Sequence, residues 1–231
     1  MQRKAIIIGA TGRIGQALVQ EISSLYATVT VIARHAPKFI SKNMLVYTVP
    51  DFDNLEQVLS SVVLDEKTDM FCCLSGEKMD KQDDEYLSKV YFDYPLNFIK
   101  ICHQKNVRRL FLLSKISGKQ KTVHDRLHAV LSTFDWQLCA VFLVDKITLS
   151  DDYSVKNLGK KAMRLLQSFL PHEEPLAPKQ IAVSMALVAF WTLYDGRYIG
   201  LLKPSYTHTY IYENINYISH EQILNLTNKN F

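Results

Sequence analysis

Three glycines near the start of the chain have the spacing of a phosphate-binding turn. Gly9, Gly12 and Gly15 follow an apolar run at residues 5–8 and precede an amphipathic pattern at residues 14–22. Gly9 would allow the tight turn, Gly12 the close approach of a pyrophosphate, and Gly15 the packing of the helix on a sheet. The phosphates would lie at the positive end of that helix. The pattern predicts a dinucleotide site formed by Gly9, Thr11, Gly12, Arg13, Ile14 and Gly15.

Basic residues follow the second predicted strand, where the adenosine ribose of a bound dinucleotide would lie. Arg34 ends this strand, and Arg13 and Lys38 are the other cations near it. An acidic residue here would accept a hydrogen bond from the ribose of NAD, whereas a cation favours the 2′-phosphate of NADP. We therefore expect NADP as the cofactor, with NAD as the alternative. Arg34 could also be an ordinary solvated residue at the end of a strand.

Two further segments are candidates for contacts with the rest of the dinucleotide. Asp51 could accept a hydrogen bond from the adenine amino group, and Phe52 could flank the adenine ring. The Asp-x-Asp sequence there also fits the N-cap of a helix. Leu74, Ser75 and Gly76 follow the fourth predicted strand, where the backbone must pass close to the cofactor.

These residues are positioned by strand-like and helix-like segments that alternate along the chain. Most of the strand-like segments are short, continuous apolar runs, as in parallel strands covered on both faces. Strands are expected at Lys4–Ile8, Thr28–Ala33, Met44–Val49, Asp69–Leu74, Arg109–Leu113 and Gln137–Phe142. Helices are expected at Ile14–Ser24, Leu55–Val62, Glu85–Gln104 and Val123–Thr133. The alternation predicts an α/β fold, a doubly wound parallel sheet with helices on both faces.

The pattern changes beyond Asp145, where a proline-rich loop separates two further helices. Expected elements in this part are the helices Lys156–Leu170 and Lys179–Tyr194, the β-like pieces Tyr198–Leu202 and Thr209–Tyr212, and a helix capped by Ser219 and Gln222. We expect one domain over residues 1–231. Residues 1–144 would form its dinucleotide-binding core, and residues 145–231 a small cover over the substrate crevice.

Composition bounds the remaining classes of function. The chain has 231 residues and a net charge of +4, which is too small and too scattered to favour a nucleic-acid partner. No apolar run is long enough to span a bilayer and no targeting peptide is evident, so we expect a cytoplasmic protein without a membrane partner. The cysteines lie in apolar stretches without metal-ligand spacing and are expected to be reduced core residues: Cys72, Cys73, Cys102 and Cys139.

The order of these motifs resembles the short-chain dehydrogenase/reductase superfamily. Within it, the chain is similar to the atypical single-domain group that includes the Tat-interacting oxidoreductase and NmrA-like proteins. The matching segments are Gly9–Gly15, Arg34, Asp51-Phe52, residues 72–76, Val90–Tyr94, Leu112–Ser114 and Tyr212–Asn214. The resemblance implies a Rossmann fold, an NAD(P)(H) cofactor and three catalytic residues: a Ser, and a Tyr followed four residues later by a Lys.

The catalytic residues that the resemblance implies are only partly present. Ser114 matches the family serine, but His124 and His128 stand where Tyr and Lys are expected. The family Lys lies on the same helix face as the Tyr and lowers its pKa. Two histidines instead disfavour each other's protonated form and supply no fixed charge. The catalytic candidates are thus Ser114, His124 and His128. We expect no metal site at the histidine pair, because a third ligand is missing.

Two functions remain open from these residues. The chain could be a catalytically silent NADP(H)-binding protein that reports redox state to a regulatory protein partner. Alternatively, it could be an NADP-dependent oxidoreductase that acts on a small carbonyl substrate. In that case Ser114 would polarise the carbonyl, and His124 or a water molecule would deliver the proton. Either function is compatible with a monomer or a homodimer.

Overall fold

The structure is a computed structural model that describes residues 3–74, 84–145, 147, 175–194 and 212–228. Its strands are β1 (Lys4–Ile8), β2 (Thr28–Ala33), β3 (Met44–Thr48), β4 (Thr68–Cys72), β5 (Arg109–Lys115), β6 (Leu138–Val144) and β7 (Asn216–Ile218). Its helices are α1 (Arg13–Ile22), α2 (Leu55–Ser60), α3 (Asp84–Ser88), α4 (Tyr94–Gln104), α5 (Gly118–Leu131), α7 (Pro178–Tyr194) and α9 (His220–Asn228). A π-helical segment, η1 (Lys89–Asp93), joins α3 to α4.

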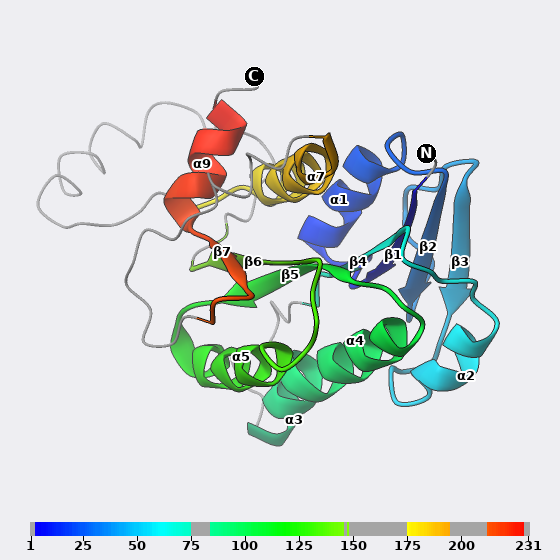
Figure 1. The fold of residues 1–231 in the computed structure, drawn as a ribbon, viewed down its shortest axis with the longest axis horizontal. Helices are drawn as coiled ribbons and strands as arrows, with labels where there is room; N and C mark the ends of the chain where they lie inside the picture. The colour runs from blue at the N-terminus through cyan, green and yellow to red at the C-terminus, as the bar shows by residue number, and fades with distance from the viewer. Residues whose placement is uncertain (1–2, 75–83, 146, 148–174, 195–211, 229–231) are drawn as a thin grey trace, which may run out of the picture.

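The described strands form one parallel sheet in the order β3-β2-β1-β4-β5-β6-β7 (Figure 1). The chain therefore moves outward from β1 in one direction, returns, and continues from β4 in the other direction. This order confirms the predicted doubly wound α/β fold, in which a ligand crevice forms beside the central strands β1 and β4.

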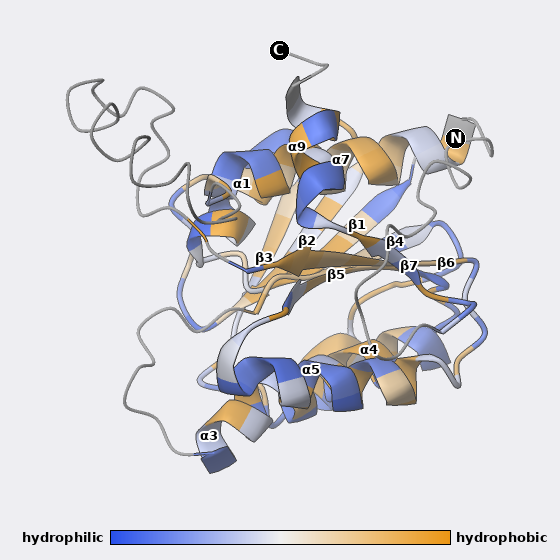
Figure 2. Ribbon diagram, turned by 90° about the vertical axis from the view of Figure 1, so that its left-hand side faces the viewer, coloured by the Kyte–Doolittle hydropathy of each residue, from blue (hydrophilic) through white to orange (hydrophobic). Residues whose placement is uncertain are grey.

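Helices cover both faces of the sheet (Figure 2). Helices α1, α7 and α9 lie on one side, while α3, α4 and α5 lie on the other. Because side chains alternate along a strand, Ala5 and Ile7 of β1 pack into the first core, and Ile6 and Ile8 into the second. The continuous apolar runs of the central strands thus serve two separate cores, as the sequence pattern predicts.

Helix α7 is apolar on most sides because most of its residues pack against other elements. It packs between α1 and α9, and most of its described residues are buried. Among the described residues, no helix is both long and apolar enough to cross a membrane.

The largest differences from the sequence prediction occur in three places, while other boundaries differ by one or two residues. The expected helix Glu85–Gln104 contains the π-helical segment η1, and α5 begins at Gly118 rather than at Val123. Strand β7 was not predicted, because three residues are too few for a recognisable pattern. Ser219 and Gln222 form the predicted reciprocal cap of α9 through each other's backbone N–H. The expected elements Lys156–Leu170 and Tyr198–Leu202, and residues 209–211, lie outside the described residues.

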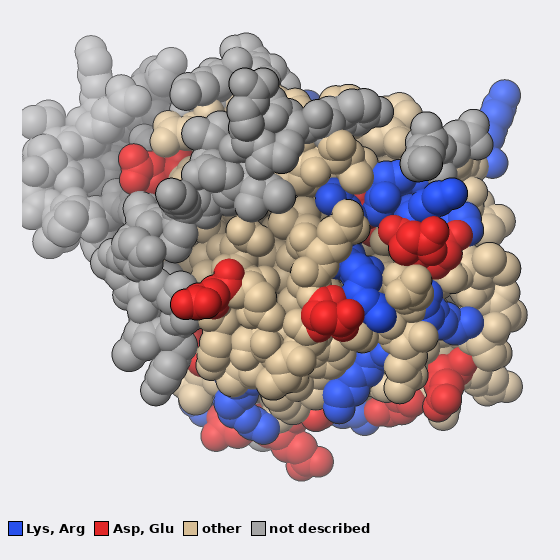
Figure 3. All heavy atoms as spheres, in the orientation of Figure 1, with Lys and Arg blue, Asp and Glu red and all other residues tan. Residues whose placement is uncertain are grey.

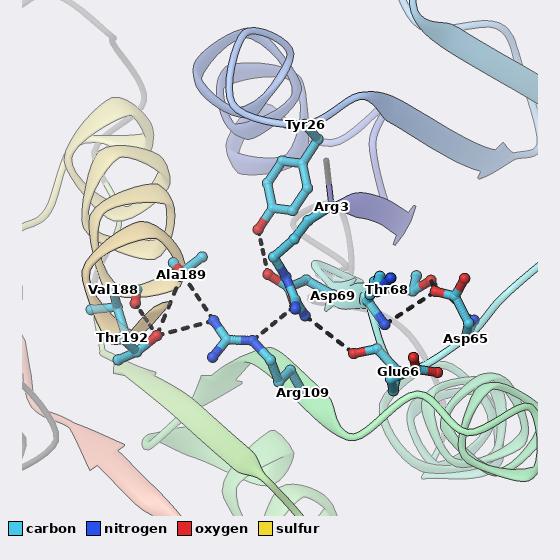
Figure 4. Close-up of polar contacts among 11 residues, drawn as sticks. Arg3, Tyr26, Asp65, Glu66, Thr68, Asp69, Arg109, Val188, Ala189 and Thr192 are labelled. Carbon is cyan, nitrogen blue, oxygen red and sulfur yellow. Dashed lines mark hydrogen bonds and ion pairs between the residues drawn. The ribbon is translucent and has the colours of Figure 1, made fainter. Parts of the chain in front are cut away.

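A buried ionic cluster lies at the amino ends of β4 and β5 (Figure 4). The Asp69 carboxylate accepts hydrogen bonds from Arg3, from the Tyr26 hydroxyl at 2.6 Å and from Arg109 Nε at 2.8 Å. Arg109 Nη2 also donates to the Ala189 carbonyl at 2.9 Å and to Thr192 Oγ1 at 3.0 Å, both in α7. One carboxylate thus connects the sheet to the last turns of α7.

Candidate functional site

The described strands end at one edge of the sheet, where several of the predicted cofactor residues lie. All strands are parallel, and Ile8 pairs with both Ile32 of β2 and Cys72 of β4, which in turn pairs with Leu112 of β5. The residues that follow these four positions therefore lie along the carboxyl edge, where ligands of doubly wound folds bind. This alignment brings the glycine turn, Arg34, Leu74 and Ser114 to the same edge.

The backbone of the glycine turn leaves no room for side chains at two positions. Gly9 has a positive φ of 81°, and a Cβ on it would lie 2.4 Å from the Cys73 carbonyl carbon. A Cβ on Gly15 would lie 2.1 Å from the Gly9 carbonyl oxygen. Gly12 N–H closes the turn by donating to the Gly9 carbonyl at 3.1 Å. Contacts therefore require glycine at residues 9 and 15, and the positive φ requires it at residue 9 as well.

The N-terminus of α1 is open toward a negatively charged ligand. Gly12 stands at the N-cap and provides no side-chain cap, and the first turn of α1 contains no acidic residue. The Thr11 carbonyl accepts a hydrogen bond from Gln16 Nε2 at 2.6 Å, which holds the loop against the helix. Ile14 and Gly15 are buried, while Arg13 is half-buried. This arrangement fits a pyrophosphate at the helix N-terminus.

Arg34 lies at the end of β2 and is exposed, as is Lys38. Across the described part of the face drawn in Figure 3, basic and acidic side chains are interspersed. Arg34 and Lys38 are thus exposed cations near the carboxyl end of β2, where the sequence analysis expects the adenosine ribose of a dinucleotide.

The two residues predicted to contact adenine have different surroundings. Asp51 is half-buried and accepts a hydrogen bond from the Asp53 backbone N–H at 2.9 Å, so it shapes the turn before α2. Phe52 is buried and packs edge-on against the Tyr94 ring, with centroids 5.5 Å apart. Lys89 connects the same region by pairing with Asp53 at 2.9 Å.

The end of β4 passes directly beside the glycine turn. Cys73 N–H donates to the Ile8 carbonyl at 3.0 Å and so extends the pairing between β1 and β4. The next residue, Leu74, is half-buried. Ser75 and Gly76 lie outside the described residues.

Ser114 lies near the carboxyl end of β5 and faces the layer of α4 and α5. It is two residues after Leu112, which packs into that core, so the alternation of side chains places both on the same face. Ser114 is 1% exposed, and its Oγ has no hydrogen-bond partner in the described part of the chain. A buried hydroxyl without a partner is costly and is expected to find one in a ligand or in water.

His124 and His128 are both buried on the face of α5 that packs on the sheet. They share this face with Leu127 and Leu131, at the spacing of neighbours on a helix. Burial, then the charge of His128, then that of Lys115, lower the pKa of His124 to about 3. At neutral pH, His124 is therefore an uncharged imidazole that can donate from one ring nitrogen and accept at the other.

Two tyrosines that the sequence analysis did not select lie beside this histidine pair. Tyr91 of η1 packs edge-on against His124, with centroids 5.2 Å apart, and Tyr217 of β7 packs edge-on against His128 at 5.5 Å. Tyr91 belongs to the Val90–Tyr94 segment that carries part of the family resemblance. The sequence therefore identified this segment but not the contact of Tyr91 with His124. Tyr217 lies in the strand that has no sequence signal.

The four cysteines are buried and free, as predicted. Burial raises the pKa of Cys72 to about 12 and also raises the pKa of Cys73, Cys102 and Cys139, so all four thiols are protonated at neutral pH. Within the described ranges, no group of three or more His, Cys, Asp or Glu side chains is placed to hold a metal ion.

Comparisons with known proteins point to the same class of fold and site. Residues 5–129 match the model of the NAD dependent epimerase/dehydratase family. A short-chain type dehydrogenase/reductase from Mycobacterium ulcerans superposes with a TM-score of 0.63 at 12% identity, over 97% of this chain and 91% of that one. For a short chain dehydrogenase family protein from Francisella tularensis, the TM-score is 0.60 at 13% identity, over 97% and 100%.

A third similar structure contains a dinucleotide. WbmG from Bordetella bronchiseptica, determined in complex with NAD, superposes with a TM-score of 0.59 at 14% identity, over 85% of this chain and 70% of that one. At these identities the solved structures show a shared fold. No curated protein matches the sequence.

Proposed function

The chain belongs to the NAD dependent epimerase/dehydratase family, and from that premise we propose that it binds NADP(H) in preference to NAD(H) at the carboxyl edge of its sheet. The packing of the glycine turn carries this proposal. Backbone atoms occupy the space that a Cβ of Gly9 or Gly15 would need, and the N-terminus of α1 has no side-chain cap. Such a turn can hold a pyrophosphate against backbone N–H groups.

The preference for NADP(H) is supported by the charges around the end of β2. Arg34 and Lys38 are exposed there, and Arg13 begins the helix opposite. A guanidinium binds a phosphate through paired, charge-assisted hydrogen bonds, whereas a ribose hydroxyl gains little from it.

The first prediction concerns the positive charge of Arg34. Replacing Arg34 by Ser should weaken NADPH binding by about 10-fold, since a charge-assisted hydrogen bond contributes about 1.5–3 kcal/mol. NADH affinity should change less than about twofold in calorimetric titrations. Lys42→Ser, which removes an exposed cation before β3, is the matched control and should leave both affinities unchanged. Equal losses for NADPH and NADH in Arg34→Ser would contradict a 2′-phosphate contact.

Two roles for the bound nucleotide follow from the residues beside it. A redox-sensing role without chemistry, in which the nucleotide signals to a regulatory protein, is supported by the histidines at the positions of the usual Tyr and Lys. A catalytic role on a small carbonyl substrate is supported by a specific observation. Ser114 Oγ and His124 Nδ1 are buried polar atoms with no hydrogen-bond partner in the described part of the chain. A carbonyl oxygen could accept from both groups.

The second prediction separates these two roles. NADPH oxidation, followed at 340 nm with a panel of aldehydes and ketones, should exceed the rate without substrate if the protein is an oxidoreductase. Ser114→Ala should then lower turnover by about 100-fold, because it removes one donor to the developing oxyanion, while NADPH affinity stays unchanged. Binding of NADPH without oxidation on any substrate would favour the sensing role.

We also propose a cytoplasmic location. The four buried cysteines are free, which fits a reducing compartment.

A further inference from the structure

Four aromatic rings form a row between the sheet and the layer of α3, α4 and α5. The row runs from Tyr91 through His124 and His128 to Tyr217, and successive ring centroids lie 5.2, 6.3 and 5.5 Å apart. Both tyrosines meet their histidine edge-on, with interplanar angles of 64°. All four side chains are buried, although they come from three elements that are distant in sequence.

The π-helical segment brings Tyr91 to this row. Tyr91 is the only buried residue of η1, at 1% exposure, and η1 packs against α5. Buried positions before and after it, Leu87 and Pro95, are each four residues away. Four residues of an α-helix turn through about 40° more than one full turn. In a regular α-helix, each of these three positions would therefore point about 40° away from the one before it. The wider π turn offsets that rotation, and such turns are often found at functional sites.

The groups that act on His124 come from the three elements around it. Tyr91 faces it from η1, His128 lies one turn further along α5, and the charge of Lys115 reaches it from the end of β5. Lys115 follows Ser114 on the strand, so its side chain starts on the opposite face of the sheet. In the described part of the chain, no carboxylate forms an ion pair with His124. Its imidazole is 2% exposed and Nδ1 lacks a hydrogen-bond partner among these residues.

Resting on the catalytic function proposed above, we propose that the four-ring row holds His124 as an uncharged hydrogen-bond donor at the substrate oxygen. We further infer that the substrates carry an electron-withdrawing group beside the reacting carbonyl, as 1,2-diketones do. Tyr91 is the positioning residue of this arrangement, because its ring packs edge-on against the His124 imidazole.

The substrate class follows from the negative charge that develops on the carbonyl oxygen during hydride transfer. When bound, the reduced nicotinamide supplies a hydride, which forms the new C–H bond at the carbonyl carbon and leaves the ring oxidised. The electron pair of the C=O π bond moves to the oxygen, where Ser114 and His124 donate hydrogen bonds, and a proton from water completes the alcohol. An uncharged donor stabilises this oxyanion less than a charged one. A neighbouring carbonyl compensates by withdrawing electron density from the same oxygen.

The state of His124 can be measured without any turnover. In an NMR titration of the imidazole C2 protons, identified by their loss in His124→Gln, the His124 signal should keep its neutral position from pH 5 to pH 9. A His124 midpoint inside this range would overturn the proposal. This measurement does not depend on the cofactor, so it stands even if NADPH does not bind.

The substrate class is tested with a matched pair of ketones. With NADPH, kcat/KM for 2,3-butanedione should exceed that for 2-butanone by at least about 100-fold. His124→Gln keeps an uncharged donor and should retain activity within about 10-fold, whereas His124→Leu should lose about 100-fold. Tyr91→Phe keeps the ring and should be active, while Tyr91→Leu should lower kcat with KM unchanged. The control His103→Gln, on α4 and paired with Asp135, should behave as the wild type.

The outcomes separate this proposal from the one on which it rests. Failure of NADPH to bind would refute the proposed function and the substrate class together. Binding with equal turnover of both ketones would leave the oxidoreductase function standing and overturn the substrate class. Activity that survives in His124→Leu would overturn the role of His124.

Discussion

At the scale of single residues, two described glycines with a positive φ differ in the contacts that a side chain would make. Gly9 and Gly118 have φ values of 81° and 68°, so both adopt a conformation that side chains disfavour. A Cβ on Gly9 would meet the backbone of Cys73, whereas a Cβ on Gly118 would meet only the end of the Gln120 side chain, at 2.9 Å. The flexible Gln120 can move and the strand backbone cannot.

The third prediction compares these two positions in urea unfolding. Gly118→Ala should cost about 1–2 kcal/mol for the left-handed conformation alone. Gly9→Ala should cost about 2 kcal/mol more, because the added methyl group must displace the end of β4. Equal losses in the two variants would show that the close contact at Gly9 does not restrict the side chain there.

The fourth prediction concerns the pH dependence that burial of His124 creates. Its pKa is about 3 in the folded protein and about 6.5 when unfolded. Between these values the unfolded chain binds a proton that the folded chain does not. The free energy of unfolding therefore falls as pH decreases below about 6.5, by up to about 1.4 kcal/mol per pH unit from this group. His124→Gln should flatten the profile between pH 4.5 and 6.5, measured by urea unfolding.

A matched variant controls for the other groups that titrate in this range. His35→Gln removes an exposed histidine after β2 and should keep the wild-type profile. If His124→Gln retains the full wild-type slope, His124 is not held neutral by the fold.

The sequence predicts the positions of the candidate residues along the sheet edge better than the packing contacts that they make. The glycine turn and Ser114 could be predicted because each follows a recognisable strand, and parallel strands end at a common edge. The contacts of Tyr91 and Tyr217 with the histidines could not be predicted, since they depend on how η1 and β7 pack against α5. Local periodicity does not describe packing between segments.

At the scale of elements, the Asp69 cluster joins parts of the fold that the sequence pattern treats as separate. Arg109 begins β5, yet its guanidinium reaches the last turns of α7, 80 residues further along the chain. Thr192 of α7 also donates to the Val188 carbonyl at 2.6 Å, so its hydroxyl is held in the helix (Figure 4). Buried charges of this kind are tolerated only when they are paired.

The fifth prediction tests this cluster by removing its carboxylate. Asp69→Asn leaves two guanidinium groups without their counter-charge in a buried place and should cost about 3–5 kcal/mol of unfolding free energy. Asp65→Asn is the matched control, since Asp65 pairs with Lys4 at 2.8 Å where both side chains are about one-third exposed. That variant should cost less than about 1 kcal/mol. Similar losses in both variants would mean that Asp69 contributes no more than a surface ion pair.

The boundaries of elements agree with the prediction where the residue pattern is clear at both ends of the element. Strands β1 and β2 match their predicted ranges, because each consists mainly of β-branched residues and is followed by polar or glycine residues. Helix α5 starts five residues early, at Gly118, because its first turn is polar and has no apolar periodicity. The π turn in η1 depends on its packing against α5, which propensity along the chain does not encode.

At the scale of the whole molecule, the alternation of strands and helices determines the architecture. Parallel strands need crossover helices, and right-handed crossovers on both sides of β1 lead to helices on both faces of the sheet. The fold and the family resemblance were therefore predictable from residues 1–144, and both are confirmed. The addition of β7 to the sheet and the position of α7 between α1 and α9 required the structure.

We propose that a dinucleotide binds at the carboxyl edge of the sheet, with its pyrophosphate on the N-terminus of α1. The most direct test follows the backbone amide NMR signals during titration with NADPH. We expect the largest shifts at residues 9–15, with further shifts at Arg34 and Leu74, while the amides of Asp69 and Arg109 at the opposite edge stay unchanged. Largest shifts at that opposite edge, or no shifts at residues 9–15 with saturating NADPH, would contradict it.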